Sequence, residues 1–196
     1  MGLCKKYAAA SKMYAMHHPE LEPRFREVFD LVQTHLENKY EIPVVISDVP
    51  NPFTGDLDGA EIRIDYDLNA EDSLFILVHL FGHTAQWNLS EAARRIGTAP
   101  PANVTDELLE AIREYELEAC AYSVQLFQNL GVHDLDQWLS DFAACDLRYL
   151  MHFYRSGGEK RPFFDFWREG SPLVPPRPIP YFRPTRWVSR ADGVVV

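Results

Sequence analysis

Two histidines stand four residues apart in the apolar stretch FILVHLFGHTAQW, residues 75–87. Residues at this spacing share one face of a helix, so His79 and His83 can reach a single tetrahedral metal ion. Their neighbours are apolar nearly all round, which predicts a helix that is buried on most sides. The same features suit two core histidines with ordinary hydrogen-bond partners, and the spacing alone does not decide between these interpretations.

A zinc site needs a third protein ligand, and a later segment offers several acids. DELLEAIREYELEACAYSVQLFQNL, residues 106–130, predicts a long helix with Thr105 as its N-cap. Its candidate ligands are the carboxylates of Glu110, Glu114, Glu116 and Glu118. At about 100° per residue, the first, second and fourth of these lie on one face, and Glu116 points elsewhere, roughly 200° from Glu118.

The pair LVHLFGHTAQW and EYELEACAYSVQLF resembles the ImmA/IrrE family of metallopeptidases. The zinc helix of that family reads like HELGH, and a later helix carries an ExEAxxFA-type segment that supplies the third ligand. The resemblance covers residues from about 40 to 127. It implies zinc as the cofactor, His79, His83 and Glu118 as its ligands, and a polypeptide as the substrate. Imidazole and carboxylate ligands also suit other divalent metals.

The chain departs from the family at Leu80, where the family has the glutamate that acts as general base. A leucine cannot accept a proton, and general-base catalysis contributes roughly 10²–10⁴ in rate. Glu114, one turn before Glu118, could take over the role of base, with Tyr122 one turn after it as an oxyanion donor. The alternatives are that Glu114 supports a ligand and that Tyr122 is a core residue.

These features predict a zinc-binding, metallopeptidase-like protein with an impaired or atypical catalytic site that acts on or binds a polypeptide. The alternative, which Leu80 favours, is an inactive pseudo-peptidase that serves as a protein-binding or regulatory module. Whether the chain is an enzyme therefore stays open at this point. In metallopeptidases of this type an exposed strand aligns the peptide by strand addition, and residues 60–67 are expected to be that strand.

The pattern of helices and strands around the site predicts an α+β domain with a small sheet packed by helices. The resemblance implies that this is a zincin-like domain with a mostly antiparallel sheet. Asn69 is expected to cap the helix that carries the two histidines. The segment 48–59 is rich in Pro, Gly, Asp and Asn, which is typical of a loop. The expected helices span residues 19–39, 70–88, 105–130 and 134–157, and the expected strands span residues 42–47 and 60–67.

The last forty residues differ in composition from the rest of the chain. They hold seven basic and four acidic side chains, whereas the whole chain has a net charge of -10. Six prolines fall between Pro172 and Pro184, and aromatic residues are frequent. We therefore expect one domain over residues 1–156 and an extended tail over residues 157–196 that wraps the acidic domain and could cover its cleft.

The overall charge limits the classes of partner. An acidic chain argues against general binding of nucleic acid or anionic membranes, because phosphate contacts need clustered Lys and Arg. The sequence contains no apolar run of the roughly 18 residues that a membrane span requires. Three cysteines without a CxxC spacing fit a reducing compartment, so we expect a cytoplasmic protein. The expected partner is a polypeptide substrate or another protein.

Overall fold

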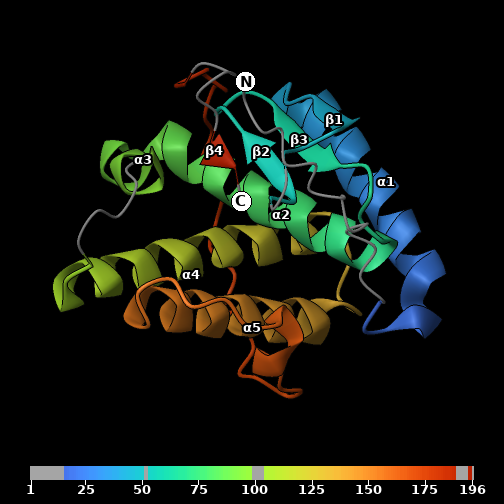
Figure 1. The fold of residues 1–196 in the computed structure, drawn as a ribbon. Helices are drawn as coiled ribbons and strands as arrows, with labels where there is room; N and C mark the ends of the chain where they lie inside the picture. The colour runs from blue at the N-terminus through green and yellow to red at the C-terminus, as the bar shows by residue number, and fades with distance from the viewer. Residues whose placement is uncertain (1–15, 51–52, 99–103, 189–193, 196) are drawn as a thin grey trace, which may run out of the picture.

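The computed structural model describes residues 16–50, 53–98, 104–188 and 194–195, and predictions on the other residues, such as the first fifteen of the expected domain, lie outside this part of the chain. The fold is α+β, which confirms the predicted class (Figure 1). The helices are α1 (Glu22–Tyr40), α2 (Ala70–Leu89), α3 (Glu91–Thr98), α4 (Asp106–Asn129) and α5 (Asp136–Arg155), with 3-10 turns η1 (Pro19–Leu21) and η2 (Phe163–Phe166). The strands are β1 (Val44–Ser47), β2 (Gly55–Leu57), β3 (Ile62–Asp65) and β4 (Val194–Val195).

The sheet has the strand order β1-β3-β2-β4 and is mixed. β1 pairs with β3 in parallel, whereas β2 is antiparallel to both β3 and β4. The expectation that residues 60–67 form an exposed strand for peptide addition is wrong, because β3 has a partner strand on each side. β2 lies inside the segment 48–59 that was predicted to be a loop. Its three residues are too few to give a detectable alternation of polar and apolar side chains.

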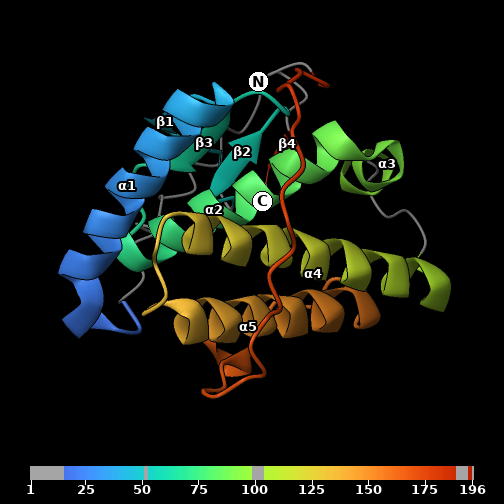
Figure 2. The same ribbon diagram turned by 180° about the vertical axis from the view of Figure 1, so that it is seen from behind.

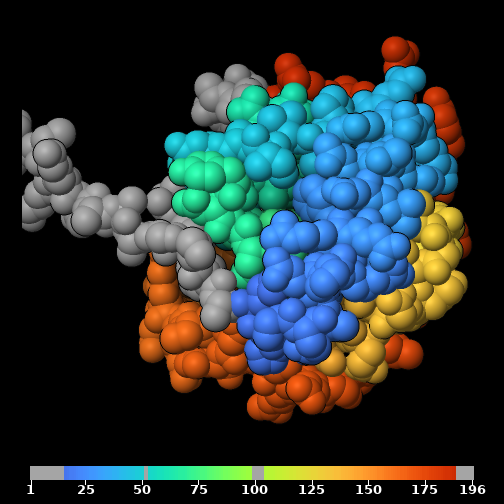
Figure 3. Space-filling model, turned by 90° about the vertical axis from the view of Figure 1, so that its right-hand side faces the viewer, coloured from blue at the N-terminus to red at the C-terminus, as the bar shows by residue number. Residues whose placement is uncertain are grey.

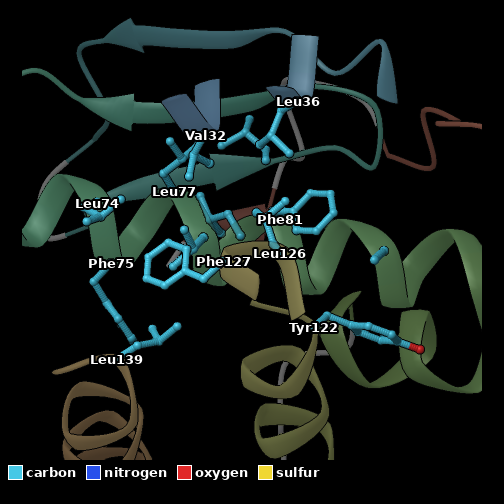
Figure 4. Packing of buried hydrophobic residues seen from close by; sticks show 14 of the residues in the cluster. Val32, Leu36, Leu74, Phe75, Leu77, Phe81, Tyr122, Leu126, Phe127 and Leu139 are labelled. Carbon is cyan, nitrogen blue, oxygen red and sulfur yellow. The ribbon is translucent and has the colours of Figure 1, made fainter. Parts of the chain in front are cut away.

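The elements form successive layers, with α2 in the middle (Figure 1). α2 packs against β2 and β3 on one side and against α4 on the other, and α4 packs in turn on α5. Figure 4 shows Leu36 of α1 beside Leu77 and Phe81 of α2, with Phe127 of α4 nearby. All four side chains are fully buried. The helix that carries the two histidines is therefore the core helix that its composition predicted.

Local signals in the sequence set the ends of the two central helices. The Asn69 side chain accepts a hydrogen bond from the backbone N–H of Asp72 at 2.9 Å, and Thr105 accepts one from Leu108 at 3.2 Å. Both predicted N-caps are confirmed. Past the end of α4, Gly131 has φ of 72°, a conformation that glycine adopts without strain. Within the described ranges, no helix is both long enough and apolar enough to cross a membrane.

The chain after α5 runs back over the domain without helix or strand from residue 168 to residue 187 (Figure 2). The backbone N–H of Arg177 donates to the carbonyl of Ala121 in α4 at 3.1 Å, and that of Trp187 donates to the carbonyl of Asp58 at 2.8 Å. Two ion pairs add to these contacts: Arg177 with Glu118 and Arg186 with the buried Asp58. The basic tail thus neutralises acidic side chains of the domain on which it lies.

Candidate metal centre

Three metal-ligating side chains from α2 and α4 converge in the interior. The Nε2 atoms of His79 and His83 lie 3.0 Å apart. The Oε2 atom of Glu116 lies 3.4 Å from the His79 nitrogen and 3.2 Å from the His83 nitrogen. These residues form a candidate metal-binding group.

The close approach of α2 and α4 at Gly82 makes this convergence possible. A Cβ atom on Gly82 would lie 2.3 Å from the carbonyl oxygen of Ala119, which real contacts do not allow. The hydroxyl of Ser123 fixes the same crossing by donating to the carbonyl of Val78 at 2.7 Å. Glycine between the two histidines therefore brings the backbone of α4 within reach of both imidazoles.

The cluster is largely shielded from solvent, since His79 and His83 are 5% and 2% exposed and the Glu116 side chain is 12% exposed. The ring of Phe75 stacks on His79 with centroids 5.3 Å apart, and that of Tyr115 stacks on His83 at 4.5 Å. Burial, together with the charge of His83, lowers the pKa of His79 to about 3, although Glu116 opposes this shift. His79 is therefore neutral at pH 7 and retains a nitrogen lone pair for a cation.

Gln86 fixes the tautomer of His83. The Gln86 amide nitrogen donates to the Tyr115 carbonyl at 2.8 Å and to the Glu118 carboxylate at 2.7 Å, and both of these groups only accept. The Gln86 amide oxygen therefore faces Nδ1 of His83, 2.9 Å away, so this nitrogen carries the hydrogen. In neutral His83 the lone pair is then on Nε2 and points toward Glu116 and His79.

With neutral imidazoles, the carboxylate of Glu116 and the Nε2 lone pair of His83 are both acceptors. Oε2 of Glu116 is buried and accepts no hydrogen bond of ordinary geometry within the described chain. Burial favours the neutral acid, but the two histidines outweigh it and lower the pKa of Glu116. An ionised carboxylate facing a nitrogen lone pair at 3.2 Å needs a cation between them, either a proton or a metal ion.

The spacing of the three atoms fits a tetrahedral zinc ion. With ligands at about 2.0–2.1 Å from the metal, the ligand atoms of such a site lie roughly 3.3 Å from one another. The observed separations of 3.0, 3.2 and 3.4 Å bracket this value. The residues present therefore fit a small divalent cation, and their distances do not identify which one.

The structure places Glu116, and not the predicted Glu118, beside the two histidines. The carboxylate of Glu118 instead accepts from Gln86 and pairs with Arg177 at 2.5 Å. Glu118 thus contacts the cluster only through Gln86, as an outer support for His83. Alignment with the family motif indicated Glu118 as the third ligand. The rotation of α4 about its axis instead turns Glu116, two positions earlier, toward α2.

The two predicted catalytic residues also lie outside the cluster. Glu114 is exposed and lines a groove of about 510 Å³ between α3 and α4, together with Glu118 and Arg177. Tyr122 is buried, with the Arg177 guanidinium 5.6 Å from its ring centre. Burial first, and then the charge of Glu118, raise the pKa of Tyr122. Neither side chain is among those that meet at the two imidazoles.

The position of Glu116 has a signal in the sequence. It falls in the stripe of α4 that also holds Ile112 and Cys120, at helical spacings of four, and both of these are buried. An acidic residue that is alone in an apolar stripe is predicted to face the interior. Glu110 and Glu114, in contrast, belong to an exposed acidic stripe. This pattern distinguishes Glu116 from its neighbours without reference to any family.

Two further residues near the cluster were not predicted to contribute to it. The thiol of Cys120 lies 4.0 Å from Nδ1 of His79, and burial followed by the charge of Glu116 raises its pKa well above the usual value. Asp146 of α5 also feels the charge of Glu116, and burial first and this charge second raise its pKa far above the ordinary range. Burial and the charge of Glu116 therefore both favour the protonated form of Asp146.

Comparison of the chain with protein-family models, with curated proteins and with solved structures finds no match.

Proposed function

We propose that this chain binds zinc through His79, His83 and Glu116 and is a metallopeptidase-like protein, similar to the ImmA/IrrE family, with an impaired catalytic site that acts on or binds a polypeptide. The observation that carries the proposal is the convergence of two imidazole nitrogens and one carboxylate oxygen within 3.4 Å of one another. Two histidines and one glutamate are also the ligand set of catalytic zinc sites in several peptidases.

The chain prepares these ligands for a cation. Hydrogen bonding to Gln86 directs the His83 lone pair into the cluster, and the low pKa of His79 keeps that ring neutral at physiological pH. The lowered pKa of Glu116 keeps this carboxylate ionised. Zinc held there would act as a Lewis acid that polarises a carbonyl oxygen.

The impairment follows from the absence of a placed general base within the described chain. Leu80 is fully buried and faces the sheet, since a Cβ atom on Gly55 of β2 would meet its side chain at 2.7 Å. Asp146 is not among the groups whose ligand atoms meet at the two imidazoles. With Glu114 in the outer groove, Glu116 is the ionised carboxylate in the cluster, and it serves as a ligand.

The burial of the cluster favours a second candidate, an inactive pseudo-peptidase that acts as a protein-binding module. Two surface grooves, of about 510 and 850 Å³, flank α4, and none of the three ligands lines either of them. A polypeptide bound in these grooves would contact the shell around the metal and not the metal itself. The metal would then stabilise the core that presents the binding surface.

Elemental analysis of tag-free protein, purified without chelators, tests the metal assignment. We expect a buried divalent ion, retained after brief dialysis against a weak chelator, that is lost in His79→Ala. His35→Ala is the matched control, because His35 lies on α1 and is not one of the residues of the cluster. If wild type and His79→Ala retain equal amounts of metal after the same dialysis, the proposed ligand set is incorrect.

Turnover separates the two candidate functions. We expect metal-loaded protein to cleave unfolded casein at a rate at least 10²-fold below that of a peptidase with a placed base. Any residual cleavage should disappear in Glu116→Gln and persist in Glu114→Gln. Complete absence of cleavage with intact metal binding would favour the pseudo-peptidase. Cleavage that depends on Glu114 would contradict the geometry described above.

A further inference from the structure

A second group of metal-ligating side chains lies at the surface near the first turn of α2. His17 and His18 come directly before η1, and Glu169 follows η2 in the chain after α5. One ligand atom from each lies within 4.8 Å of the other two. Figure 3 shows the start of α1 in blue against the orange chain that follows α5, so two segments far apart in the sequence meet here.

The ring of His18 is oriented by a buried carboxylate. Its Nδ1 lies 2.7 Å from Oε1 of Glu71, which is 0% exposed. The same carboxylate accepts from Nε1 of Trp138 at 3.0 Å and from the backbone N–H groups of His17 and His18 at 2.6 and 2.9 Å. A carboxylate surrounded by donors acts as an acceptor, so Nδ1 of His18 carries the hydrogen.

This arrangement leaves Nε2 of His18 as the coordinating atom. A histidine that donates its other ring hydrogen to a carboxylate is the usual partner pair of a metal ligand, because the carboxylate fixes the ring and raises its basicity. Glu71 cannot itself be reached by solvent, so its role toward His18 is orientation and not direct binding of an exposed ion.

Aromatic packing holds the second imidazole in place. The ring of His17 stacks on Phe164 with centroids 5.0 Å apart and planes 5° apart, and lies 4.4 Å from the centroid of Trp167. Phe164 and Trp167 belong to the same stretch of chain as Glu169. The residues that position His17 therefore lie only five and two positions before Glu169 in the chain.

We infer that His17, His18 and Glu169 form a second site for a divalent transition metal, of the class that imidazole and carboxylate bind together. This site is independent of the buried cluster and goes beyond the proposed function. An ion there links the segment before α1 to the chain that follows α5. Because His17 and Glu169 are exposed, the ion exchanges with solvent more readily than one in the buried cluster.

Zinc titration of the tag-free full chain by isothermal calorimetry tests this inference. Wild type is expected to bind two equivalents, and the double variant His79→Ala/His83→Ala is expected to bind one. Adding His17→Ala to the double variant should remove the remaining equivalent. In wild type, Glu169→Gln should weaken one of the two equivalents at least 10-fold, and its exposed position leaves the fold intact. His133→Ala, with its imidazole 65% exposed in the loop before α5, is the matched control.

The result that would overturn the inference is a wild type that binds one equivalent, with no change in Glu169→Gln or His17→Ala. A residual equivalent that survives His17→Ala and Glu169→Gln would overturn it as well. Failure of the buried centre gives a different pattern, because the double variant would then bind as much zinc as wild type. The two proposals are thus separated by one set of titrations.

Discussion

The two histidine clusters of this chain use the same ligand types at different depths. In the buried cluster, His79 and His83 belong to one core helix, and a neutral amide, that of Gln86, orients His83. In the surface cluster the ligands come from two chain segments, and the carboxylate of Glu71 orients His18. A neutral partner avoids adding a second buried charge beside Glu116, which an interior site tolerates poorly.

Depth also determines what each cluster requires in the absence of a metal. At the surface, water can satisfy His17 and Glu169. In the interior, Oε2 of Glu116 faces two imidazole nitrogens without a hydrogen bond of ordinary geometry in the described chain. Metal binding should therefore be coupled strongly to the free energy of unfolding at the buried cluster and weakly at the surface cluster.

Substitution of Gly82 should disrupt the buried cluster and leave the surface cluster intact. It should have the largest effect on the free energy of unfolding. The new Cβ of Gly82→Ala meets the backbone of Ala119, so α2 and α4 must separate. We expect a loss of about 2–3 kcal/mol in the free energy of unfolding, measured by urea denaturation, despite the better helix propensity of alanine. Zinc affinity of the buried cluster should fall more than 10-fold.

Ser73→Ala is the matched control on the same helix, because Ser73 is only half-buried. Its free energy of unfolding should stay within about 0.5 kcal/mol of wild type. Zinc binding at the surface cluster should be unchanged in both variants. A Gly82→Ala protein as stable as wild type would mean that the helices do not approach as closely as described.

Separate substitutions of the two residues that orient the histidines, Gln86 and Glu71, sharpen the comparison between the clusters. Gln86→Leu removes the acceptor for Nδ1 of His83, and Glu71→Gln weakens the acceptor for Nδ1 of His18. Each change should lower zinc affinity at its own cluster by roughly 10- to 100-fold and leave the other cluster unaffected, as measured by calorimetric titration. Equal effects of one variant on both clusters would show that it acts through global destabilisation.

The smallest effect concerns Asp72, which lies next to Glu71. Burial first, and then the charge of Glu71, raise the pKa of Asp72 to about 7, although Asn69 opposes the shift. A raised pKa favours the protonated folded state, so this contribution to stability is complete below about pH 4 and is lost as the pH rises through 7. Asp72→Asn should therefore be more stable than wild type by about 1–2 kcal/mol at pH 8.

Denaturation at several pH values checks this sign. The advantage of Asp72→Asn should shrink toward zero as the pH falls to 4, because wild type is then protonated at the same position. The N-cap bond from the backbone of Asp72 to Asn69 remains in the variant, so helix capping is not changed. An advantage that is the same at pH 4 and pH 8 would mean that Asp72 does not titrate as described.

The sequence predicted the parts of this fold that depend on local chemistry. Asn69 and Thr105 cap their helices as expected, and the predicted strands 42–47 and 60–67 contain β1 and β3. It did not predict β2, whose three residues acquire strand structure by pairing with β3 and β4. Such pairing depends on residues distant in sequence, which a local pattern does not contain.

The candidate site was predicted in part for a related reason. His79 and His83 are on the same helix, so their spacing was sufficient to bring them together. The third ligand is on another helix, and its identity depends on how that helix is rotated. The apolar stripe through Ile112 and Cys120 contained this information, whereas similarity of letters to a family pointed to Glu118. The surface cluster depends on the path of the chain after α5, which no local pattern reveals.

The central claim is that Glu116 is the third ligand of the buried cluster. The most direct test compares the zinc affinity of that cluster in Glu116→Gln with its affinity in Glu118→Gln. These variants make the same chemical change two residues apart on α4. The account predicts a loss of at least 100-fold for Glu116→Gln, which removes a charged ligand, and of no more than about 10-fold for Glu118→Gln, which alters only the support of Gln86. A greater loss in Glu118→Gln than in Glu116→Gln would contradict it.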